Sequence, residues 1–432
     1  MLRFLTAGES HGRALVVVVE GLPAGLPITV EDVSAELARR RLGFGRGPRM
    51  RFEADQVSLL GGVRHGRTLG SPVAVEIGNS EWERKWTQEM SPAPGAPASV
   101  LTQPRPGHAD LAGMQKYGFD DARDVLERAS ARETAARVAA GTLAKALLAT
   151  LGVRIVSHVI QLGDVRASEG LRPTFEDLDQ VDGSPVRCFD ADAEPRMVAA
   201  VKAAAKDGDS LGGVAEIVAY GVPVGLGSHV HWDRRLDGLL AQALMSIQAV
   251  KAVEMGEGWE AAGRRGSEAH DAIKVDTSAV LSGGFGRDTA RAGGIEGGIS
   301  IGGLVVARVA MKPLATLNRP VLETVDVSTG ESTVSFRERT DVTAVPAMGV
   351  VAETMMALVL ANEALRKFGG DSMSEVTRNR DGFVAALGET HSGARPPDTG
   401  IPDAGIPDTG IPDTGPPEGR SSISGAPPGT GR

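Results

Sequence analysis

The sequence contains very few cysteine and aromatic residues. Its single cysteine, Cys188, cannot form a disulfide within the chain, which is typical of a protein from a reducing compartment. Aromatic residues make up 4% of the 432 residues, so the core must be built mainly from aliphatic side chains and alanine. A signal-peptide pattern is also lacking, and the most apolar long stretch, 345–361, carries Glu353 at its middle. We therefore expect a soluble, cytoplasmic protein.

An overall basic charge and the common nucleotide-binding motifs are lacking too. The chain has 46 Lys and Arg against 55 Asp and Glu, a formal net charge of −9, which argues against a broad nucleic-acid-binding surface. No phosphate-binding P-loop motif occurs. The glycine-rich stretch 43–47 lacks the G-x-G-x-x-G spacing and follows a predicted helix instead of a strand, so a Rossmann site is not supported.

The composition changes near residue 393. From Pro397 onward, a Pro-Asp-Thr/Ala-Gly pattern repeats every five residues. Such a segment has almost no apolar face with which to form a core. We predict one large catalytic domain over 1–393 and a disordered tail, rich in Pro, Gly and Asp, over 394–432, dispensable unless it binds a partner.

Hydrophobic periodicity predicts both helices and strands in the large domain. Helices are expected at 30–42, 132–151, 196–206, 234–254 and 347–368. Strands are expected at 14–20, 73–77, 153–162, 214–220, 300–309 and 332–337. Because the strands come in groups, an α+β fold is favoured over regular βαβ alternation. The proline-rich stretch 91–106 predicts a long surface loop.

Arginine is concentrated in one short segment. Six arginines lie within residues 39–51, among glycines that allow a ligand to approach the backbone closely. Guanidinium groups bind carboxylates and phosphates through two parallel hydrogen bonds. This pattern favours a small polyanionic ligand, and the alternative is a solvated basic surface.

Two histidines lie in loop-like segments. His11 stands between small residues in 8–12, and His108 lies between Arg105 and Asp110. Histidine transfers protons readily near neutral pH, so an acid–base pair is one interpretation and two structural histidines are the other. His229 and His231 are interpreted as surface residues, because no carboxylate or cysteine cluster with metal-ligand spacing accompanies them.

Three further segments suggest binding or catalysis. The start of the alanine-rich helix, at 127–134, could bind an anion through its free N–H groups and Arg128, Ser130 and Arg132, or could be a simple serine cap. The stretch 293–303 has six glycines, which could pack against a flat ring or form flexible turns. An Arg-Thr-Asp triplet at 339–341 precedes a predicted helix, where a salt bridge is the simpler interpretation.

These motifs, in this order, resemble those of the chorismate synthase family. The resemblance covers about residues 1–390 and is greatest to the actinobacterial branch. The matching segments are 8–12, 43–49, 105–110, 128–134, 297–300, 312–316 and 339–346.

The resemblance implies a reaction, a fold and an assembly. Chorismate synthases eliminate phosphate from 5-enolpyruvylshikimate-3-phosphate in a 1,4-anti reaction that yields chorismate and needs reduced FMN without net redox change. The implied fold is a single α+β domain with antiparallel sheets sandwiched between helices, assembled as a homotetramer. No added module for flavin reduction is evident, so we expect NADPH to act only indirectly, through an external flavin reductase.

The resemblance also assigns residues. It implies His11 as general acid at the departing phosphate, His108 as the residue that protonates or steadies the reduced flavin, and Asp341 as part of a proton relay at the flavin edge. It implies FMN contacts at Arg128, Ala129, Ser130, Gln248, Ala249, Gly297, Lys312, Pro313, Leu314, Ala315, Thr316 and Arg339. Substrate contacts are implied at Arg40, Arg46, Arg49, Arg105, Arg132 and Arg339, although Arg40 and Arg46 could bind NADP instead.

Two other functions remain open from the sequence. An NADPH-dependent flavin reductase or another oxidoreductase would show net hydride transfer. A flavin- or RNA-binding structural protein would use the arginines of 39–51, but only Phe44 and Phe52 could stack on bases there.

Overall fold

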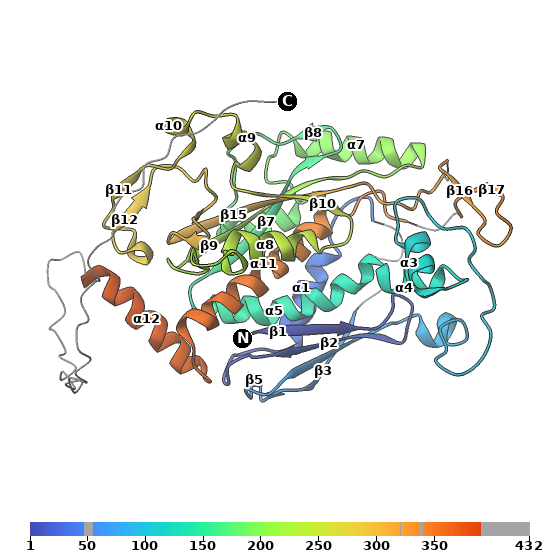
Figure 1. The fold of residues 1–432 in the computed structure, drawn as a ribbon, viewed down its shortest axis with the longest axis horizontal. Coiled ribbons are helices and arrows are strands. Elements are labelled where there is room, and N and C mark those ends of the chain that lie inside the picture. Colours follow the sequence, from blue (N-terminus) through green and yellow to red (C-terminus); the bar gives the residue numbers. More distant parts are fainter. Residues whose placement is uncertain (47–54, 320, 337–339, 390–432) are drawn as a thin grey trace, which may run out of the picture.

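The computed structural model describes residues 1–46, 55–319, 321–336 and 340–389. Arg49, Arg339 and the predicted tail lie outside these ranges. Two antiparallel sheets and the helices between them make up most of the described chain (Figure 1).

The first sheet has four strands, in the order β1-β2-β6-β3. Its strands are β1 (Arg3–Ala7), β2 (Ala14–Glu20), β6 (Val73–Gly78) and β3 (Gln56–Gly61). The second sheet has five strands, in the order β10-β15-β9-β7-β8. Its strands are β10 (Val250–Met255), β15 (Gly303–Met311), β9 (Gly213–Val222), β7 (Arg154–Leu162) and β8 (Val165–Arg166). Four two-stranded hairpins complete the strands: β4 (Val63–Arg64) with β5 (Arg67–Thr68), β11 (Ile273–Val275) with β12 (Phe285–Arg287), β13 (Ile295–Glu296) with β14 (Ile299–Ser300), and β16 (Glu323–Val325) with β17 (Ser332–Val334).

The helices connect and cover these strands. The α-helices are α1 (Val30–Arg40), α3 (Asp110–Tyr117), α4 (Arg123–Ala129), α5 (Thr134–Thr150), α6 (Leu178–Gly183), α7 (Glu194–Asp207), α8 (Leu236–Met245), α9 (Gly258–Ala262), α10 (Gly266–Ala269), α11 (Val345–Phe368) and α12 (Met373–Glu389). Single turns are the π-helical η1 (Trp82–Trp86) and the 3-10 turns η2 (Ala131–Glu133), η3 (Phe175–Asp177), η4 (Trp232–Arg234) and η5 (Val280–Ser282).

Two long helices fill the space between the sheets. α5 packs on β2 and β6 of the first sheet, α11 packs on β7 and β9 of the second, and the two helices pack on each other (Figure 1). Their crossing is tight: a Cβ atom added to Gly141 would lie 2.1 Å from the Cβ of Thr354. This contact explains why position 141 is a glycine, because a larger side chain there would push the two helices apart.

The predicted α+β class with antiparallel sheets is confirmed. The order of the layers differs from the expected one, since the long helices lie between the sheets and not outside them. The helix predicted over 234–254 is wrong in its second half: α8 ends at Met245, and β10 begins at Val250. Ala249 has a φ of 66°, which a helix cannot contain, and the following residues pair with β15 instead.

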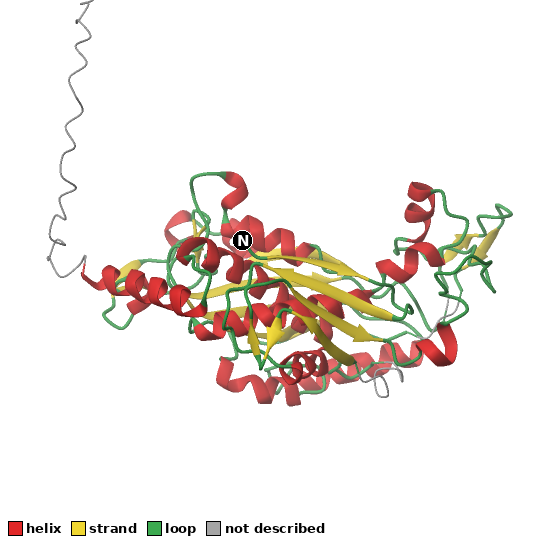
Figure 2. Cartoon of the chain, turned by 90° about the horizontal axis from the view of Figure 1, so that it is seen from below, coloured by secondary structure: helices red, strands yellow, loops and turns green. Residues whose placement is uncertain are grey.

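A smaller group of elements lies at one end of the molecule. α3, α4 and the β16–β17 hairpin lie together there (Figures 1 and 2). Met114, Ala122 and Leu126 form a small apolar cluster against Phe336. Residues 91–106 form the predicted long loop, and Thr324 donates a hydrogen bond of 2.6 Å to the carbonyl of Pro104. This end group therefore places the loop that carries Arg105 and His108.

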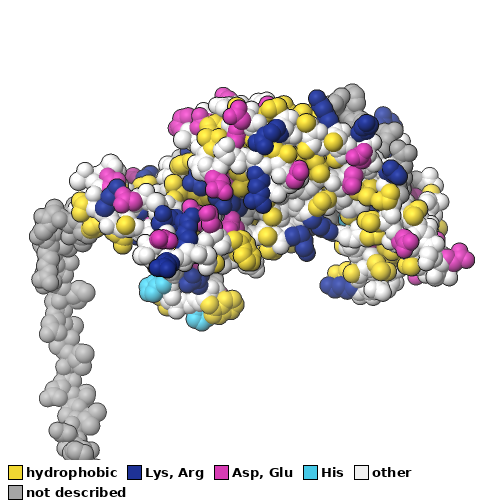
Figure 3. Space-filling view, turned by 90° about the horizontal axis from the view of Figure 1, so that it is seen from above, with side chains coloured by type: hydrophobic (Ala, Val, Ile, Leu, Met, Phe, Trp, Pro, Cys, Tyr) yellow, Lys and Arg dark blue, Asp and Glu magenta, His cyan; other side chains and the backbone are white. Residues whose placement is uncertain are grey.

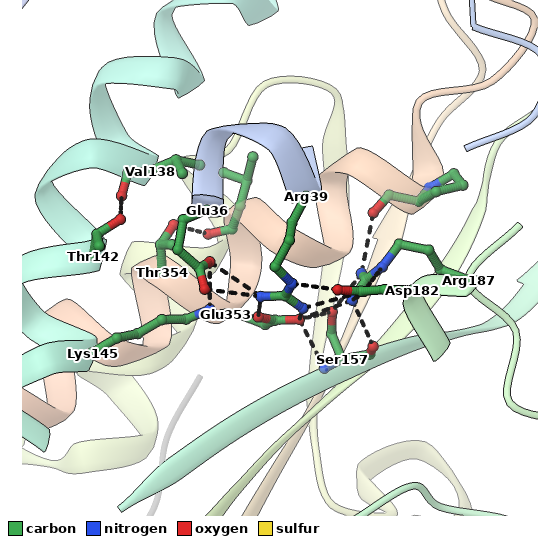
Figure 4. Close-up of polar contacts among 12 residues, drawn as sticks. Glu36, Arg39, Val138, Thr142, Lys145, Ser157, Asp182, Arg187, Glu353 and Thr354 are labelled. Atoms are coloured by element: carbon green, nitrogen blue, oxygen red, sulfur yellow. Dashed lines mark hydrogen bonds and ion pairs between the residues drawn. The ribbon is translucent and has the colours of Figure 1, made fainter. Parts of the chain in front are cut away.

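A buried ionic cluster joins α1, α5, α11 and β7 (Figure 4). The Glu353 carboxylate, fully buried on α11, accepts two hydrogen bonds from Arg39, of 2.8 and 3.1 Å, and lies 2.6 Å from Lys145 Nζ. Arg187 lies 3.2 Å from the same carboxylate, and Ser157 donates to it through its N–H and its hydroxyl. The cluster ties the last turn of α1, and so the neighbouring Arg40, to the core.

One helix, α11, is long and apolar enough to cross a membrane. Of its most apolar window, 89% is buried inside the protein, and Glu353 lies within the helix. α11 is therefore the core helix of the fold.

Candidate active site

A cavity of about 1480 Å³ opens where the ends of both sheets and of α1, α4, α5 and α11 meet. Most of the predicted site residues in the described ranges line it. They are His11, Arg40, Arg46, Arg105, His108, Ala129, Ser130, Arg132, Gln248, Ala249, Lys312, Leu314, Ala315, Thr316 and Asp341. Segments far apart in the sequence thus form one site.

Three predicted residues lie outside this lining. The Arg128 guanidinium donates hydrogen bonds to the carbonyls of Gly8 and Thr6, each of 2.9 Å, and so braces the loop that carries His11. Gly297 lies in the turn between β13 and β14, where its φ is 58°. Pro313 follows Lys312 without lining the cavity itself. Arg49 and Arg339 are outside the described residues.

The basic wall of the cavity centres on Arg40. This residue is 5% exposed, and its guanidinium donates to Thr134 Oγ1 and to the Ala131 carbonyl, each at 2.9 Å. Its Nη1 atom has no hydrogen-bond partner among the described residues. Burial, together with the nearby Arg132 and Arg46, lowers the pKa of Arg40 to about 9. This part of the cavity therefore carries more positive than negative charge.

Two carboxylates partly compensate the neighbouring arginines. Arg132 lies 2.5 Å from Asp55, and Arg46 lies 3.1 Å from Asp341. Neither carboxylate is paired with Arg40, so the centre of the wall keeps its excess positive charge.

His11 is tightly held. It lies in the loop between β1 and β2, and its Nδ1 atom is 2.8 and 2.9 Å from the two oxygens of Glu127 on α4. The indole ring of Trp86 on η1 stacks on the imidazole, with ring centroids 3.9 Å apart. Burial would raise the pKa of Glu127, but its contacts with His11 and Arg123 outweigh burial and lower the pKa. Glu127 is therefore ionised near neutral pH.

His108 also has a buried carboxylate partner. Its Nδ1 contacts Asp110, the fully buried first residue of α3, and Arg105 donates a 2.8 Å hydrogen bond to the same carboxylate. Burial opposes ionisation of Asp110, yet the hydrogen bonds from His108 and Arg105 hold its pKa well below the ordinary value. Arg105 Nη1 also donates to Thr316 Oγ1 at 3.1 Å. The loop is thus connected to the segment that follows β15.

Another part of the cavity lining carries an amide and mostly small side chains. Gln248 Nε2 donates a 2.9 Å hydrogen bond to Glu133, which also binds Thr6 and Arg137. Because a carboxylate only accepts hydrogen bonds, the amide orientation of Gln248 is determined. Its Oε1 atom is buried and has no partner in the described part of the chain. This atom is available to a donor on a ligand.

Several site residues were not identified from the sequence. Trp86, Glu127 and Asp55 contact predicted residues, but each carries little signal alone. Two of the four tryptophans lie in the charged stretch 82–86, which could have indicated a binding wall. His229 and His231 are exposed, as predicted, and no group of metal-ligating side chains occurs in the described ranges.

Charge on the outer surface is mixed. The face in Figure 3 shows Lys and Arg interspersed with Asp and Glu, without a continuous basic area. That pattern does not favour a nucleic-acid surface on this face.

Comparisons with known proteins agree on one family. The family model described as chorismate synthase matches residues 2–365. A chorismate synthase from Salinispora tropica is 59% identical over 396 residues, which cover 90% of this chain and 99% of the relative. One from Streptomyces coelicolor is 60% identical, with 89% and 98% covered. A crystal structure of chorismate synthase aligns with a TM-score of 0.72 at 39% identity, covering 90% of this chain and 98% of the other.

Proposed function

Because this chain belongs to the chorismate synthase family, a family of carbon–oxygen lyases in the shikimate pathway, we propose that the cavity around Arg40 is its catalytic site. The family's reaction is the 1,4-anti elimination of phosphate from 5-enolpyruvylshikimate-3-phosphate, which forms chorismate for aromatic amino acid biosynthesis. The oxidoreductase and RNA-binding alternatives are not favoured by any of these comparisons.

The observation that carries the proposal is the buried Arg40 cation at the centre of the basic wall, which forms no ion pair with a carboxylate in the described ranges. The substrate has two carboxylates and a phosphate, and each can accept paired hydrogen bonds from a guanidinium. Arg40 offers a buried Nη1 donor without a partner among the described residues. Arg40, Arg46, Arg105 and Arg132 would bind the substrate, together with Arg49 and Arg339 from the segments not described. We favour this role for Arg40 and Arg46 over NADP binding.

The cavity also fits a flavin, the cofactor class that the family implies. Its volume exceeds the roughly 300–1,000 Å³ of a typical single-ligand pocket, so it can hold a cofactor beside the substrate. The Oε1 atom of Gln248, which has no partner among the residues that the structure describes, suits an N–H donor of the flavin ring. Reduced FMN, when bound, would supply an electron transiently and recover it, without net redox change. The proposed contacts are those at 128–130, 248–249, 297, 312–316 and 339.

The proposed proton-handling residues are His11, His108 and Asp341. His11 would act as the general acid at the departing phosphate, through the ring nitrogen not bound to Glu127. His108 would hold a proton next to the reduced cofactor, steadied by Asp110. Asp341, paired with Arg46, would take part in the proton relay at the flavin edge. Each role requires only proton transfer over hydrogen-bond distance.

An anaerobic assay tests the function. Purified protein is mixed with dithionite-reduced FMN and 5-enolpyruvylshikimate-3-phosphate, and chorismate absorbance and phosphate release are followed together. We expect equal amounts of both products and no net oxidation of the flavin. Formation of no chorismate would refute the proposal. We propose that a separate enzyme reduces the flavin. An aerobic sample that contains the protein, the substrate, NADPH and oxidised FMN, but no flavin reductase, should therefore form no chorismate.

Replacing Arg40 with methionine should weaken substrate binding by about 10- to 100-fold, because a hydrogen bond to a charged group contributes about 1.5–3 kcal/mol. Calorimetric titration of substrate into the protein measures the change. Thermal unfolding of the ligand-free variant checks that it is folded, because Thr134 and Ala131 each lose a hydrogen-bond donor. Arg3→Met, at an exposed arginine, is the control. Unchanged affinity in Arg40→Met would contradict the role.

We also propose a cytoplasmic homotetramer whose residues 394–432 are a dispensable tail. Deleting 394–432 should leave kcat and KM within about twofold of wild type, because the described residues that line the cavity all precede residue 352. Steady-state kinetics and light scattering on both lengths of chain check this. A large loss of activity or assembly in the shorter chain would show that the tail has a function.

A further inference from the structure

We propose that Glu127 is a positioning residue that holds the proton of neutral His11 on Nδ1 and so makes Nε2 the nitrogen that exchanges protons with ligands in the cavity. The inference rests on the proposed role of His11. It goes further, because it specifies the atom that reacts and the residue that selects it.

The contacts of the Glu127 side chain carry the inference. Glu127 is 2% exposed, near the end of α4, and both of its oxygens lie within 2.9 Å of His11 Nδ1. One oxygen also accepts a 2.9 Å hydrogen bond from the backbone N–H of His11. The Glu127 carbonyl accepts another from the N–H of Ser10, also at 2.9 Å. The carboxylate therefore binds the ring and its backbone together, so ring and loop cannot move independently.

An ionised carboxylate can only accept hydrogen bonds, so Nδ1 must be the donor. Neutral imidazole carries one N–H, and a donor at Nδ1 leaves Nε2 as an acceptor. Nε2 lies across the ring, and His11 lines the cavity. Once protonated there, Nε2 can donate to a leaving oxygen while the negative charge of Glu127 stabilises the imidazolium.

Further side chains around His11 and Glu127 hold the imidazole ring and the carboxylate in this orientation. Trp86 stacks on the imidazole with an angle of 26° between the rings, which opposes rotation of the histidine. Arg123 donates a 2.9 Å hydrogen bond to Glu127 and lies 5.6 Å from the Trp86 ring centroid. Glu89 lies 3.3 Å from Arg123 on its other side. The carboxylate is thus held in place from the side away from His11.

Within the described ranges, the charged groups considered near His11 come from three segments. Glu127 and Arg123 face His11 from α4, and Glu9 lies in the same loop as His11. On η1, Lys85 lies 4.8 Å from the Trp86 ring centroid. Among these groups, Glu127 is the one whose carboxylate contacts the imidazole, so its replacement should have a specific effect.

Glu127→Gln is the informative variant. The single amide oxygen would bind the charged Arg123, since hydrogen bonds to charged groups are stronger than neutral ones. The amide NH₂ would then face Nδ1, and the backbone N–H of His11 would lose its acceptor. Nδ1 would become an acceptor, and the proton of neutral His11 would move to Nε2. The ¹⁵N chemical shifts of labelled histidine, with the His11 signals assigned from a His11→Asn sample, should show this change of tautomer in the protein without ligands. We expect kcat to fall about 100-fold or more, with KM within about twofold.

Two further variants make the test specific. Glu127→Asp keeps an ionised acceptor and should keep the Nδ1–H tautomer and recover part of the lost kcat. Asp233→Asn removes the carboxylate that pairs with the exposed His231, outside the cavity lining, and should change neither the tautomer of His11 nor kcat. An Nδ1–H tautomer in folded Glu127→Gln would overturn the inference. A changed tautomer with wild-type kcat would support the positioning role and refute the proposed role of His11.

Discussion

Replacing His11 with alanine should lower kcat by about 10²- to 10⁴-fold, the usual contribution of a general acid in the transition state. KM should stay within about threefold, because the arginines that would bind the substrate anions remain in the cavity lining. Anaerobic steady-state kinetics, with phosphate and chorismate measured in parallel, give both constants.

The matched control is His231→Ala. His231 is exposed and pairs with Asp233 far from the cavity lining, so its loss should not alter either constant. If His11→Ala retained kcat within about fivefold of wild type, proton donation at the phosphate would have to come from another group. The variant's thermal unfolding should be followed as well, because His11 also packs against Trp86.

Replacing Glu353 with alanine should lower the free energy of unfolding by about 3–5 kcal/mol, because it leaves buried cations without their shared partner. Arg39, Lys145 and Arg187 all lie within 3.2 Å of this carboxylate. Urea unfolding followed by circular dichroism measures the change. Glu36→Gln is the control, since Glu36 contacts Arg39 and Lys145 from a less buried position and should contribute about 0–1 kcal/mol.

The contribution of Glu353 to the free energy of unfolding should decrease at low pH. Burial opposes its ionisation, but Arg39, Lys145 and Arg187 hold its pKa well below the ordinary 4.5. Its contribution is therefore fully present above pH 4.5 and decreases as the pH falls, by about 1.4 kcal/mol per pH unit. The difference between wild type and Glu353→Ala should shrink accordingly below pH 4.5. A difference under 1 kcal/mol at pH 7 would contradict the assigned role of the cluster.

Elements with a clear period were predicted well from the sequence. The helix expected over 30–42 is α1, whose Thr29–Asp32 capping box is present, and the helix expected over 347–368 is α11. The short strands β1 and β3 were missed, because each contains too few residues to show a clear alternation of apolar and polar side chains. The boundary between α8 and β10 was missed because the surrounding structure imposes the positive φ of Ala249. An alanine in a sequence does not indicate a positive φ.

Sequence motifs predicted which residues belong to the candidate site. They did not predict which side chains contact one another there. Arg40, His11 and His108 were selected from the sequence, and the structure places them around one cavity. Glu127 and Trp86 went unnoticed as partners of His11, because a glutamate 116 residues away and a lone stacking ring give no local pattern. Long-range pairing depends on how the strands and helices pack.

The sequence by itself determined the composition and the motifs of this protein: a single cysteine, a core of aliphatic side chains and alanine, a local group of arginines, and the motifs of one enzyme family. These depend on residue types and short spacings, which are local properties of a chain. Only the tertiary structure decided that the long helices lie between the sheets, that Glu353 contacts three cations, and that Arg40 keeps a donor without a partner among the described residues. Burial and charge pairing join residues hundreds of positions apart, and they exist only after the chain has folded.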